Sequence, residues 1–407
     1  MLGGTTTAAD CLAALRHVAQ ARELVQGPAI AAYEQAFART IGVRHAYSFA
    51  TGRVGFYGLL RALAVKPGDE VLLQVPTHIV IPNAIRYAGA RPVYVDCRSD
   101  TYNMDLEQAE RRISPRTRVL LLQHTFGMPA DVEAALALAE RHGLEIVEDC
   151  VHALGATYDA RHVGTFGRAA FFSTEETKTI STTMGGMVVT DDARIAASVR
   201  EFQASCAWPP ALLVARYLVK LVVYHLLTEP RVHRSARTLK RRLRRLDPLP
   251  VATTPEEQHG IRPPNYEQRL SNAQAVLGLR QLARLEANVG HRRWAAERYE
   301  ARLFELGFDP PRPPAKAQPA FLRYPLRVEN RAEAMRRTAP HAVLGTWFTS
   351  VLEEALSPQY GQYEPGSCPR AEEAAKHLVN LPTHPRVGPR ALEAITSALA
   401  EARQADA

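Results

Sequence analysis

One lysine in a polar loop could carry covalent chemistry. Lys178 lies between two apolar, strand-like runs at residues 169–172 and 187–190. A lysine amine becomes a useful nucleophile when burial or a neighbouring charge lowers its pKa, and its main covalent use is a Schiff base with a carbonyl. A single loop lysine is more often a solvated cation, so Lys178 needs a second observation beside it.

Asp149 supplies that observation, because it ends the strand-like run 144–149. An acid at the end of a buried strand needs a cationic partner, and a pyridinium nitrogen is such a partner. A carboxylate beside that nitrogen keeps the ring protonated and electron-accepting, so Asp149 and Lys178 could hold the two ends of pyridoxal phosphate. Asp149 could instead cap a short helix at residues 150–154, which is the commoner role for such an Asp.

A third candidate is the turn that opens the apolar helix expected at residues 54–63. Backbone N–H groups and the positive helix end would face an anion at Gly52, Arg53 and Val54, and Arg53 could add a bidentate phosphate clamp. An ordinary strand-to-helix turn with a solvated Arg53 fits the sequence equally well.

The elements around these residues alternate between strand-like and helix-like runs from about residue 28 to 200, which predicts a sheet covered by helices on both faces. The expected strands are 45–50, 71–75, 92–96, 119–123, 144–149, 169–173 and 187–190. Ligands bind such sheets at the carboxyl ends of the strands, where Gly52, Asp149 and Lys178 would converge.

Composition narrows the class of protein. The chain has 407 residues, of which 46% are hydrophobic, and its beginning lacks the charged and apolar regions of a secretory signal. Its five cysteines show no paired spacing, so we expect a cytoplasmic protein with neither structural disulfides nor zinc.

The net charge of +8 is concentrated in one stretch, because residues 216–245 hold ten cations and one acid. This stretch belongs to an insertion at residues 205–263, in which 211–227 is nearly all apolar apart from Arg216 and Lys220. A helix of this kind followed by the basic run 231–245 suits an anionic membrane surface. The alternative is a helical hairpin packed on the enzyme or its dimer partner. Nucleic acid is the poorer interpretation, because the basic run lacks interleaved aromatic residues.

The motifs around Gly52, Asp149 and Lys178 occur in an order that resembles the DegT/StrS-type sugar aminotransferases. Further matching segments are 67–70, 124–131, 148–156, 163–167, 269–275 and 381–385. They span nearly the whole chain from about residue 28, interrupted by the insertion. The resemblance implies the aspartate-aminotransferase-like α/β fold, with a large mixed-sheet domain covered by helices and a smaller C-terminal α+β domain. It also implies pyridoxal phosphate as cofactor and a homodimer with active sites at the interface.

By the matching positions, Lys178 would form the Schiff base, Asp149 would pair with the pyridinium nitrogen, and His152 would contact the cofactor ring. The resemblance assigns the phosphate to Gly52, Arg53, Val54 and Ser173. The implied reaction takes an amino group from an amino acid, by resemblance glutamate, to a keto sugar on a nucleotide or lipid carrier, with Lys178 as leaving group and general base. Lysine at this position argues against the dehydratase branch of the family, which has a histidine there.

Three positions depart from the family pattern. Met184 stands where an acidic residue is usual, and His78 stands where an aromatic residue is usual. His78 could take the place of that aromatic residue or simply be a surface or capping histidine. Glu267 lies two residues before Arg269, where an acid would repel a phosphate from the partner subunit's site.

We therefore predict a large cofactor-binding domain at 1–204, a basic and apolar helical insertion at 205–263, and a linking helix with a small domain at 264–407. The predicted protein is an aminotransferase of keto sugars that could also lie on the inner face of the membrane. Two alternatives remain: an aminotransferase of soluble nucleotide-linked sugars without a membrane role, and a catalytically inactive scaffold of the same fold at the membrane.

Overall fold

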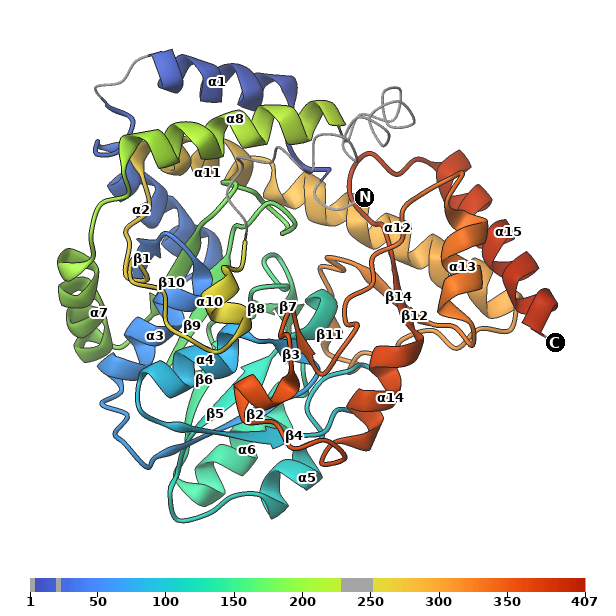
Figure 1. Cartoon of the computed structure of the whole chain (residues 1–407), viewed down its shortest axis with the longest axis horizontal. Coiled ribbons are helices and arrows are strands. Elements are labelled where there is room, and N and C mark those ends of the chain that lie inside the picture. Colours follow the sequence, from blue (N-terminus) through green and yellow to red (C-terminus); the bar gives the residue numbers. More distant parts are fainter. Residues whose placement is uncertain (1–3, 20–22, 228–251, 407) are drawn as a thin grey trace.

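A seven-stranded sheet forms the centre of the computed structural model, which describes residues 4–19, 23–227 and 252–406 (Figure 1). The strand order is β1-β10-β9-β6-β5-β2-β4. The bounds are β1 His45–Phe49, β2 Glu70–Gln74, β4 Arg91–Val95, β5 Thr117–Gln123, β6 Glu145–Asp149, β9 Ala169–Ser173 and β10 Gly186–Thr190. Strand β10 is antiparallel to both β1 and β9, and the pairs from β9 to β4 are parallel. The predicted large mixed sheet is thereby confirmed.

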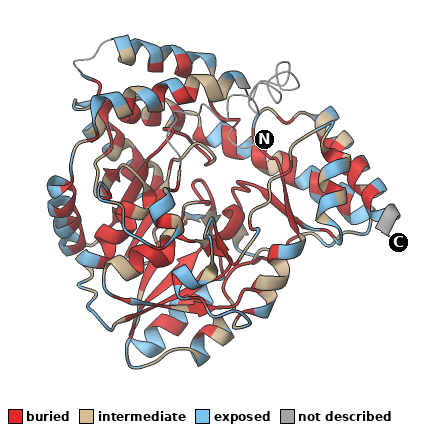
Figure 2. Cartoon of the chain, viewed as in Figure 1, coloured by how far each residue is buried: buried red, intermediate tan, exposed pale blue. Residues whose placement is uncertain are grey.

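Helices cover both faces of this sheet, and its strands are buried on both sides (Figure 2). The covering helices are α2 Ala29–Ile41, α3 Gly52–Ala62, α4 Val80–Tyr87, α5 Leu106–Arg111, α6 Val132–His142, α7 Ala193–Ser205 and α11 Asn272–Leu282. Successive side chains of a strand point to opposite faces, so Phe171 of β9 packs in the core cluster under α3 while Phe172 packs in the cluster under α2. This double burial explains the near-continuous apolar runs of the sequence.

The carboxyl ends of the parallel strands meet at one edge of the sheet. Asp149 ends β6, Ser173 ends β9, and Gly52 opens α3 just after β1. Strand β10 runs the other way, so it begins at this edge with Gly186 and closes the loop that carries Lys178. Gly52, Asp149 and Lys178 therefore lie at the same edge of the sheet, as predicted from the sequence.

The small domain follows α12 (Leu285–Glu305), a long helix that crosses from the large domain (Figure 1). Its strands β12 (Tyr324–Arg327) and β14 (Leu378–Leu381) pair antiparallel. Helices α13 Arg331–Thr338, α14 Pro369–His377 and α15 Pro389–Asp406 complete it. Strand β13 (Leu352–Glu353) returns to pair with β3 (Thr77–His78) of the large domain. Remaining short elements are β7 Thr157–Tyr158, β8 Arg161–His162, β11 Ala317–Gln318, η2 Thr125–Gly127, α10 Pro255–Gln258 and η4 Pro358–Gly361.

Helix α8 (Ala211–Leu227) contains the apolar part of the insertion and packs on α1 (Ala8–Ala19) and α11 (Figure 1). Val214, Leu218 and Leu221 of α8 are buried in one cluster with residues of α1. Lys220, one of the two cations of α8, is buried and pairs with Glu176 at 2.8 Å. Helix α8 thus packs on the enzyme, as the alternative interpretation expected.

The whole basic run 231–245 lies within residues 228–251, outside the described part of the chain. Within the described ranges, no helix combines the length and the apolar character that crossing a membrane requires. The three domain boundaries stay a prediction.

Candidate active site

Lys178 lies in the loop between β9 and β10, and only 6% of the residue is exposed. Its backbone N–H donates to the carbonyl of Glu175 at 3.0 Å, and its Nζ lies 4.6 Å from the centre of the Trp347 ring. Burial lowers the pKa of Lys178 to about 8; the charge of Glu175 opposes this shift, and that of Arg323 adds to it. The amine therefore has the desolvated setting that a nucleophilic lysine needs.

Asp149 is also buried, with one carboxylate oxygen engaged and the other free. Oδ1 accepts the Val151 N–H at 3.1 Å, whereas Oδ2 has no hydrogen-bond partner among the described residues. Burial raises the pKa of Asp149 to about 6, against the opposing effects of the Val151 N–H and Lys178. The contact with Val151 resembles the capping role considered above, but it uses a single oxygen. The other oxygen is left for a donor brought from outside.

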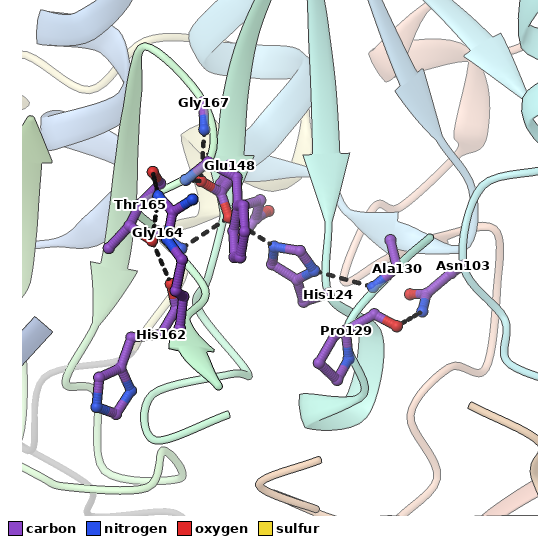
Figure 3. Close-up of polar contacts among 12 residues, drawn as sticks. Asn103, His124, Pro129, Ala130, Glu148, His162, Gly164, Thr165 and Gly167 are labelled. Carbon is purple, nitrogen blue, oxygen red and sulfur yellow. Dashed lines mark hydrogen bonds and ion pairs between the residues drawn. The ribbon is translucent and has the colours of Figure 1, made fainter. Parts of the chain in front are cut away.

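A buried network anchors the end of β6 next to Asp149 (Figure 3). Nδ1 of His124 accepts the Ala130 N–H at 3.0 Å, and its Nε2 lies 3.1 Å from Glu148 Oε2. Glu148 further accepts the backbone N–H groups of Gly164, Phe166 and Gly167 at 2.7–2.8 Å. Burial opposes ionisation of Glu148, but these hydrogen bonds still lower its pKa. Cys150 lies near enough to complete a metal-ligand set, yet the groups of His124 and Glu148 already bind other partners.

His152 lies on the same side of the site as Lys178. Its Nδ1 accepts the Phe126 N–H at 3.3 Å, and its Nε2 is buried without a hydrogen-bond partner in the described chain. Its ring centre is 5.2 Å from that of Trp347. Burial and the charge of Lys178 hold the pKa of His152 well below its usual range, so the imidazole is neutral.

The first turn of α3 closes against the beginning of β10. Thr51 caps the helix, since its side chain accepts the Val54 N–H at 3.4 Å. A Cβ on Gly186 would lie 2.3 Å from the backbone nitrogen of Gly52, which is far inside van der Waals contact. Glycine at 186 therefore allows β10 to approach the helix end where the phosphate is expected.

Arg53 is held by the chain itself. Its Nε lies 2.7 Å from Glu257 Oε1, and its Nη2 donates to the Ala252 carbonyl at 2.8 Å. Glu257 is 1% exposed, so this ion pair is shielded from water. The role of Arg53 toward a phosphate stays a prediction, since its guanidinium already has these two partners.

The other two predicted residues line the same region. Oγ of Ser173 accepts the Glu175 N–H at 3.3 Å, which leaves the hydroxyl hydrogen available for a further acceptor. His78 pairs with Glu354 at 3.4 Å, and its ring centre lies 5.7 Å from that of Trp347. Nδ1 of His78 also accepts the Val80 N–H at 3.3 Å at the start of α4, which fits the capping alternative, and a contact between His78 and the cofactor stays a prediction.

The substituted positions near the phosphate site have partners of their own. Glu267 forms an ion pair with Arg262. Arg269 stacks on the ring of Trp208, with its Cζ 4.1 Å from the ring centre. The acidic charge of Glu267 is therefore matched locally by a guanidinium.

The sequence analysis missed the small-domain residues at the site. These residues are Trp347 and Arg323. Trp347 contacts Lys178, His78 and His152. Arg323 lies over the Trp347 ring, with its Cζ 4.4 Å from the ring centre. Arg323 occurs within the strand-like run 321–328, where a charge beside Phe321 and Tyr324 was the one available signal. Trp347 follows a stretch with no periodic pattern.

Together these groups fit pyridoxal phosphate. The free Oδ2 of Asp149 can accept a hydrogen bond from a protonated ring nitrogen, which explains why a buried carboxylate oxygen lacks a partner among the residues that the structure describes. Lys178 supplies an amine of lowered pKa for the carbonyl, and the α3 end supplies an anion site near Gly52.

Comparison with known proteins agrees with this geometry. The profile of the DegT/DnrJ/EryC1/StrS aminotransferase family matches residues 6–210 and 232–400. GDP-perosamine synthase of Caulobacter vibrioides is 28% identical over 381 residues, covering 92% of this chain and 90% of that protein. The S. venezuelae DesV structure is 28% identical with a TM-score of 0.74, covering 97% of this chain and 94% of DesV.

NtdA from Bacillus subtilis, solved with bound PMP, shares the fold, with a TM-score of 0.76 and 20% identity over 98% of this chain and 83% of NtdA. The match to the family profile extends over most of the chain and, between residues 6 and 400, leaves out only 211–231. The chain belongs to the DegT/DnrJ/EryC1/StrS aminotransferase family and is a pyridoxal-phosphate-dependent aminotransferase.

Proposed function

We propose that this enzyme transfers an amino group from an amino acid, with glutamate as the expected donor, to the ketone of a nucleotide-linked sugar. The sugar class is supported by the relationship to GDP-perosamine synthase, which extends over 92% of the chain. The observation that carries the reaction type is the buried Lys178 amine in one site with the free Oδ2 of Asp149.

The residues then have distinct tasks. Pyridoxal phosphate, when bound, supplies an aromatic ring that takes up the electron pair left on the donor's α-carbon. At pH 7 a lysine of pKa about 8 is unprotonated in roughly one molecule in ten, against fewer than about one in a thousand for an exposed lysine. Lys178 can therefore attack a carbonyl and, once released, accept the α-proton of the donor.

Asp149 would hold a proton on the ring nitrogen through Oδ2, and neutral His152 would contact the ring edge through its free Nε2. Ser173 and the α3 backbone at Gly52 to Val54 would bind the phosphate, with the Arg53 charge nearby. His78 would lie beside the ring, where its pairing with Glu354 fixes its orientation.

The absorption spectrum of the protein loaded with pyridoxal phosphate tests the proposal. We expect a visible band that L-glutamate bleaches, and that a nucleotide-linked keto sugar then restores. Lys178→Ala should abolish the band, whereas Lys316→Ala, which removes a lysine that pairs with Glu133 on the surface, should leave it unchanged. A Lys178→Ala protein that keeps the band and the half-reaction would contradict the role of Lys178.

The acceptor has its own test. The same amine-loaded enzyme should react with nucleotide-linked keto sugars and fail to react with simple 2-keto acids other than the donor's own. An enzyme that returns its amino group only to keto acids would contradict the sugar assignment while leaving the aminotransferase reaction intact.

The expected homodimer belongs to the same proposal and is measured by light scattering of the purified protein.

Binding to an anionic membrane surface is a second, separate part of the proposed function. It is favoured by Leu212, Val219 and Leu226 of α8, which recur every seven residues and are 73%, 41% and 57% exposed. Together with the neighbouring basic run, such a stripe suits an anionic bilayer.

Sedimentation with anionic liposomes tests the membrane part. The wild-type protein should pellet, and the triple variant Leu212→Gln, Val219→Gln, Leu226→Gln should stay in solution. Leu356→Gln, which changes a leucine that is 61% exposed elsewhere on the surface, is the control and should pellet like the wild type. Equal sedimentation of all three proteins would exclude α8 as the contact.

A further inference from the structure

A buried arginine near Lys178 has donors that no other residue uses. Arg323 is 3% exposed, and neither its Nε nor its Nη2 has a hydrogen-bond partner within the described ranges. Its remaining nitrogen, Nη1, makes one long contact of 3.5 Å with Asn380 Oδ1. A buried guanidinium with two donors that are unpaired among the described residues is costly, so the fold keeps Arg323 at the expense of stability.

The two free nitrogens have a particular geometry. Nε and Nη2 form one edge of the planar guanidinium, and their N–H bonds point in parallel, which matches the two oxygens of a carboxylate. One face of the guanidinium is stacked on Trp347, with Cζ 4.4 Å from the ring centre. Stacking fixes the plane of the group and leaves this edge for a ligand.

The acids nearby do not occupy that edge. Glu175 and Glu353 act on Arg323 through space, but each is hydrogen-bonded elsewhere. Glu175 accepts the N–H and hydroxyl of Thr177, and Glu353 accepts those of Thr349. No direct ion pair therefore matches the charge of Arg323 within residues 4–19, 23–227 and 252–406.

The distance to the reacting amine suits a small amino acid. Lys178 Nζ and Arg323 Cζ lie 4.6 Å and 4.4 Å from the centre of the same Trp347 ring, so they are at most about 9 Å apart. Arg323 and Thr177, the neighbour of Lys178, also line a common small recess. A donor whose amine reacts beside Lys178 can place its carboxylate toward Arg323.

We propose that Arg323 is the carboxylate-binding residue of the amino-acid donor, with its Nε and Nη2 edge receiving the α-carboxylate. The proposal rests on the proposed function, because it assigns a subsite to the donor half of that reaction. It makes Arg323 a specificity residue: donors with a carboxylate on the reacting carbon react fast, and the corresponding simple amines react far more slowly.

Three loaded enzymes test this assignment: wild type, Arg323→Gln and Arg327→Gln. Arg327 lies four residues further along, at the end of β12, and is exposed, so it controls for loss of a charge from this segment. Bleaching of the visible band is followed with L-glutamate and with 4-aminobutyrate, which lacks the α-carboxylate, and with L-alanine and ethylamine as a second pair. Arg323→Gln should slow the amino acids at least 100-fold and the amines less than threefold, whereas Arg327→Gln should change neither.

Two further measurements do not depend on turnover. Calorimetric titration with glutarate, a carboxylate that cannot react, should show at least tenfold weaker binding to Arg323→Gln than to wild type. Arg323→Gln should also raise the Tm of the cofactor-free protein, because it removes an unmatched buried charge. A structural role would lower that Tm.

Equal loss of rate with amino acids and amines, or unchanged glutarate binding, would overturn the assignment. Arg323→Lys is a stricter test. It keeps the positive charge but lacks the two parallel N–H donors of the guanidinium, so it should recover less than a tenth of the rate that Arg323→Gln loses. If the wild type itself reacts with no amino acid, the proposed aminotransferase function is contradicted, and the assignment of Arg323 to the donor carboxylate is contradicted with it.

Discussion

Arg53 and Glu257 form a buried ion pair with 2.7 Å between Nε and Oε1, although they are 204 positions apart in the sequence. Glu257 is fixed by a capping box at the start of α10, and Arg53 is in the first turn of α3. The pair joins the expected phosphate site to the last part of the predicted insertion.

Breaking this pair should cost more than removing it. Arg53→Met leaves Glu257 buried without its partner, and we expect a loss of about 3 kcal/mol in the free energy of unfolding. The double variant Arg53→Met, Glu257→Gln should recover most of that loss. Urea denaturation of the single and double variants measures the coupling, and a double variant as unstable as Arg53→Met would show that the pair does not matter.

Gly186→Ala should disturb both stability and cofactor binding. The added Cβ would meet the Gly52 nitrogen at 2.3 Å, so the helix end and β10 must separate, at a cost of about 1–3 kcal/mol. We expect the affinity for pyridoxal phosphate to fall at least tenfold. Gly290→Ala, within α12 and with no atom within 4 Å, is the matched control and should gain about 1 kcal/mol. Identical behaviour of the two variants would contradict the close approach.

Asp149→Asn should stabilise the cofactor-free protein at neutral pH. Burial raises the pKa of Asp149 from 3.8 to about 6, so between these values the folded chain keeps a proton that the unfolded chain has released. Stability from this group therefore falls as the pH rises toward 6, and the cost above it is about 3 kcal/mol at most. Thermal unfolding of both proteins at pH 5 and pH 7.5 should show a larger gap at pH 7.5. The same variant should lose the half-reaction by at least 100-fold.

Covalent capture of pyridoxal phosphate should depend on pH through Lys178. Its pKa of about 8 means that the reactive free amine is depleted below pH 8 and saturates above it. Borohydride trapping and mass spectrometry at pH 6–10 should give a midpoint near 8 for the modification of Lys178. Glu175→Gln should move the midpoint to lower pH, because the charge of Glu175 raises this pKa. A midpoint near that of an exposed lysine would contradict the buried setting.

Much of the large domain could be predicted because its signals are local. The expected strands 119–123, 144–149, 169–173 and 187–190 agree with β5, β6, β9 and β10 to within two residues at either end. Parallel strands buried on both faces give continuous apolar runs, and their carboxyl ends locate a site without further knowledge. Motif order then supplied the family, which the comparison confirms.

The rest depended on contacts between distant parts of the chain. Trp347 and Arg323 come to Lys178 from a domain more than 140 residues away in sequence, and their own segments carry no pattern that reports this approach. Lys220 could not be recognised as buried, because helical spacing alone does not show which face of a helix is covered. Its partner Glu176 lies in the Lys178 loop, and only tertiary packing reveals that pairing.

The pairing of Lys220 with Glu176 connects helix α1 to the loop that carries Lys178. Glu176 is two positions before Lys178, Lys220 joins it to α8, and α8 rests on α1 through the cluster that contains Cys11 and Ala14. Asp10 of α1 also binds Arg280 and Arg284, so α1 is fastened to the body of the enzyme. A purification tag or truncation that shifts α1 will therefore alter the surroundings of the reacting amine. For this enzyme, a carboxyl-terminal tag is the safer choice for kinetic work.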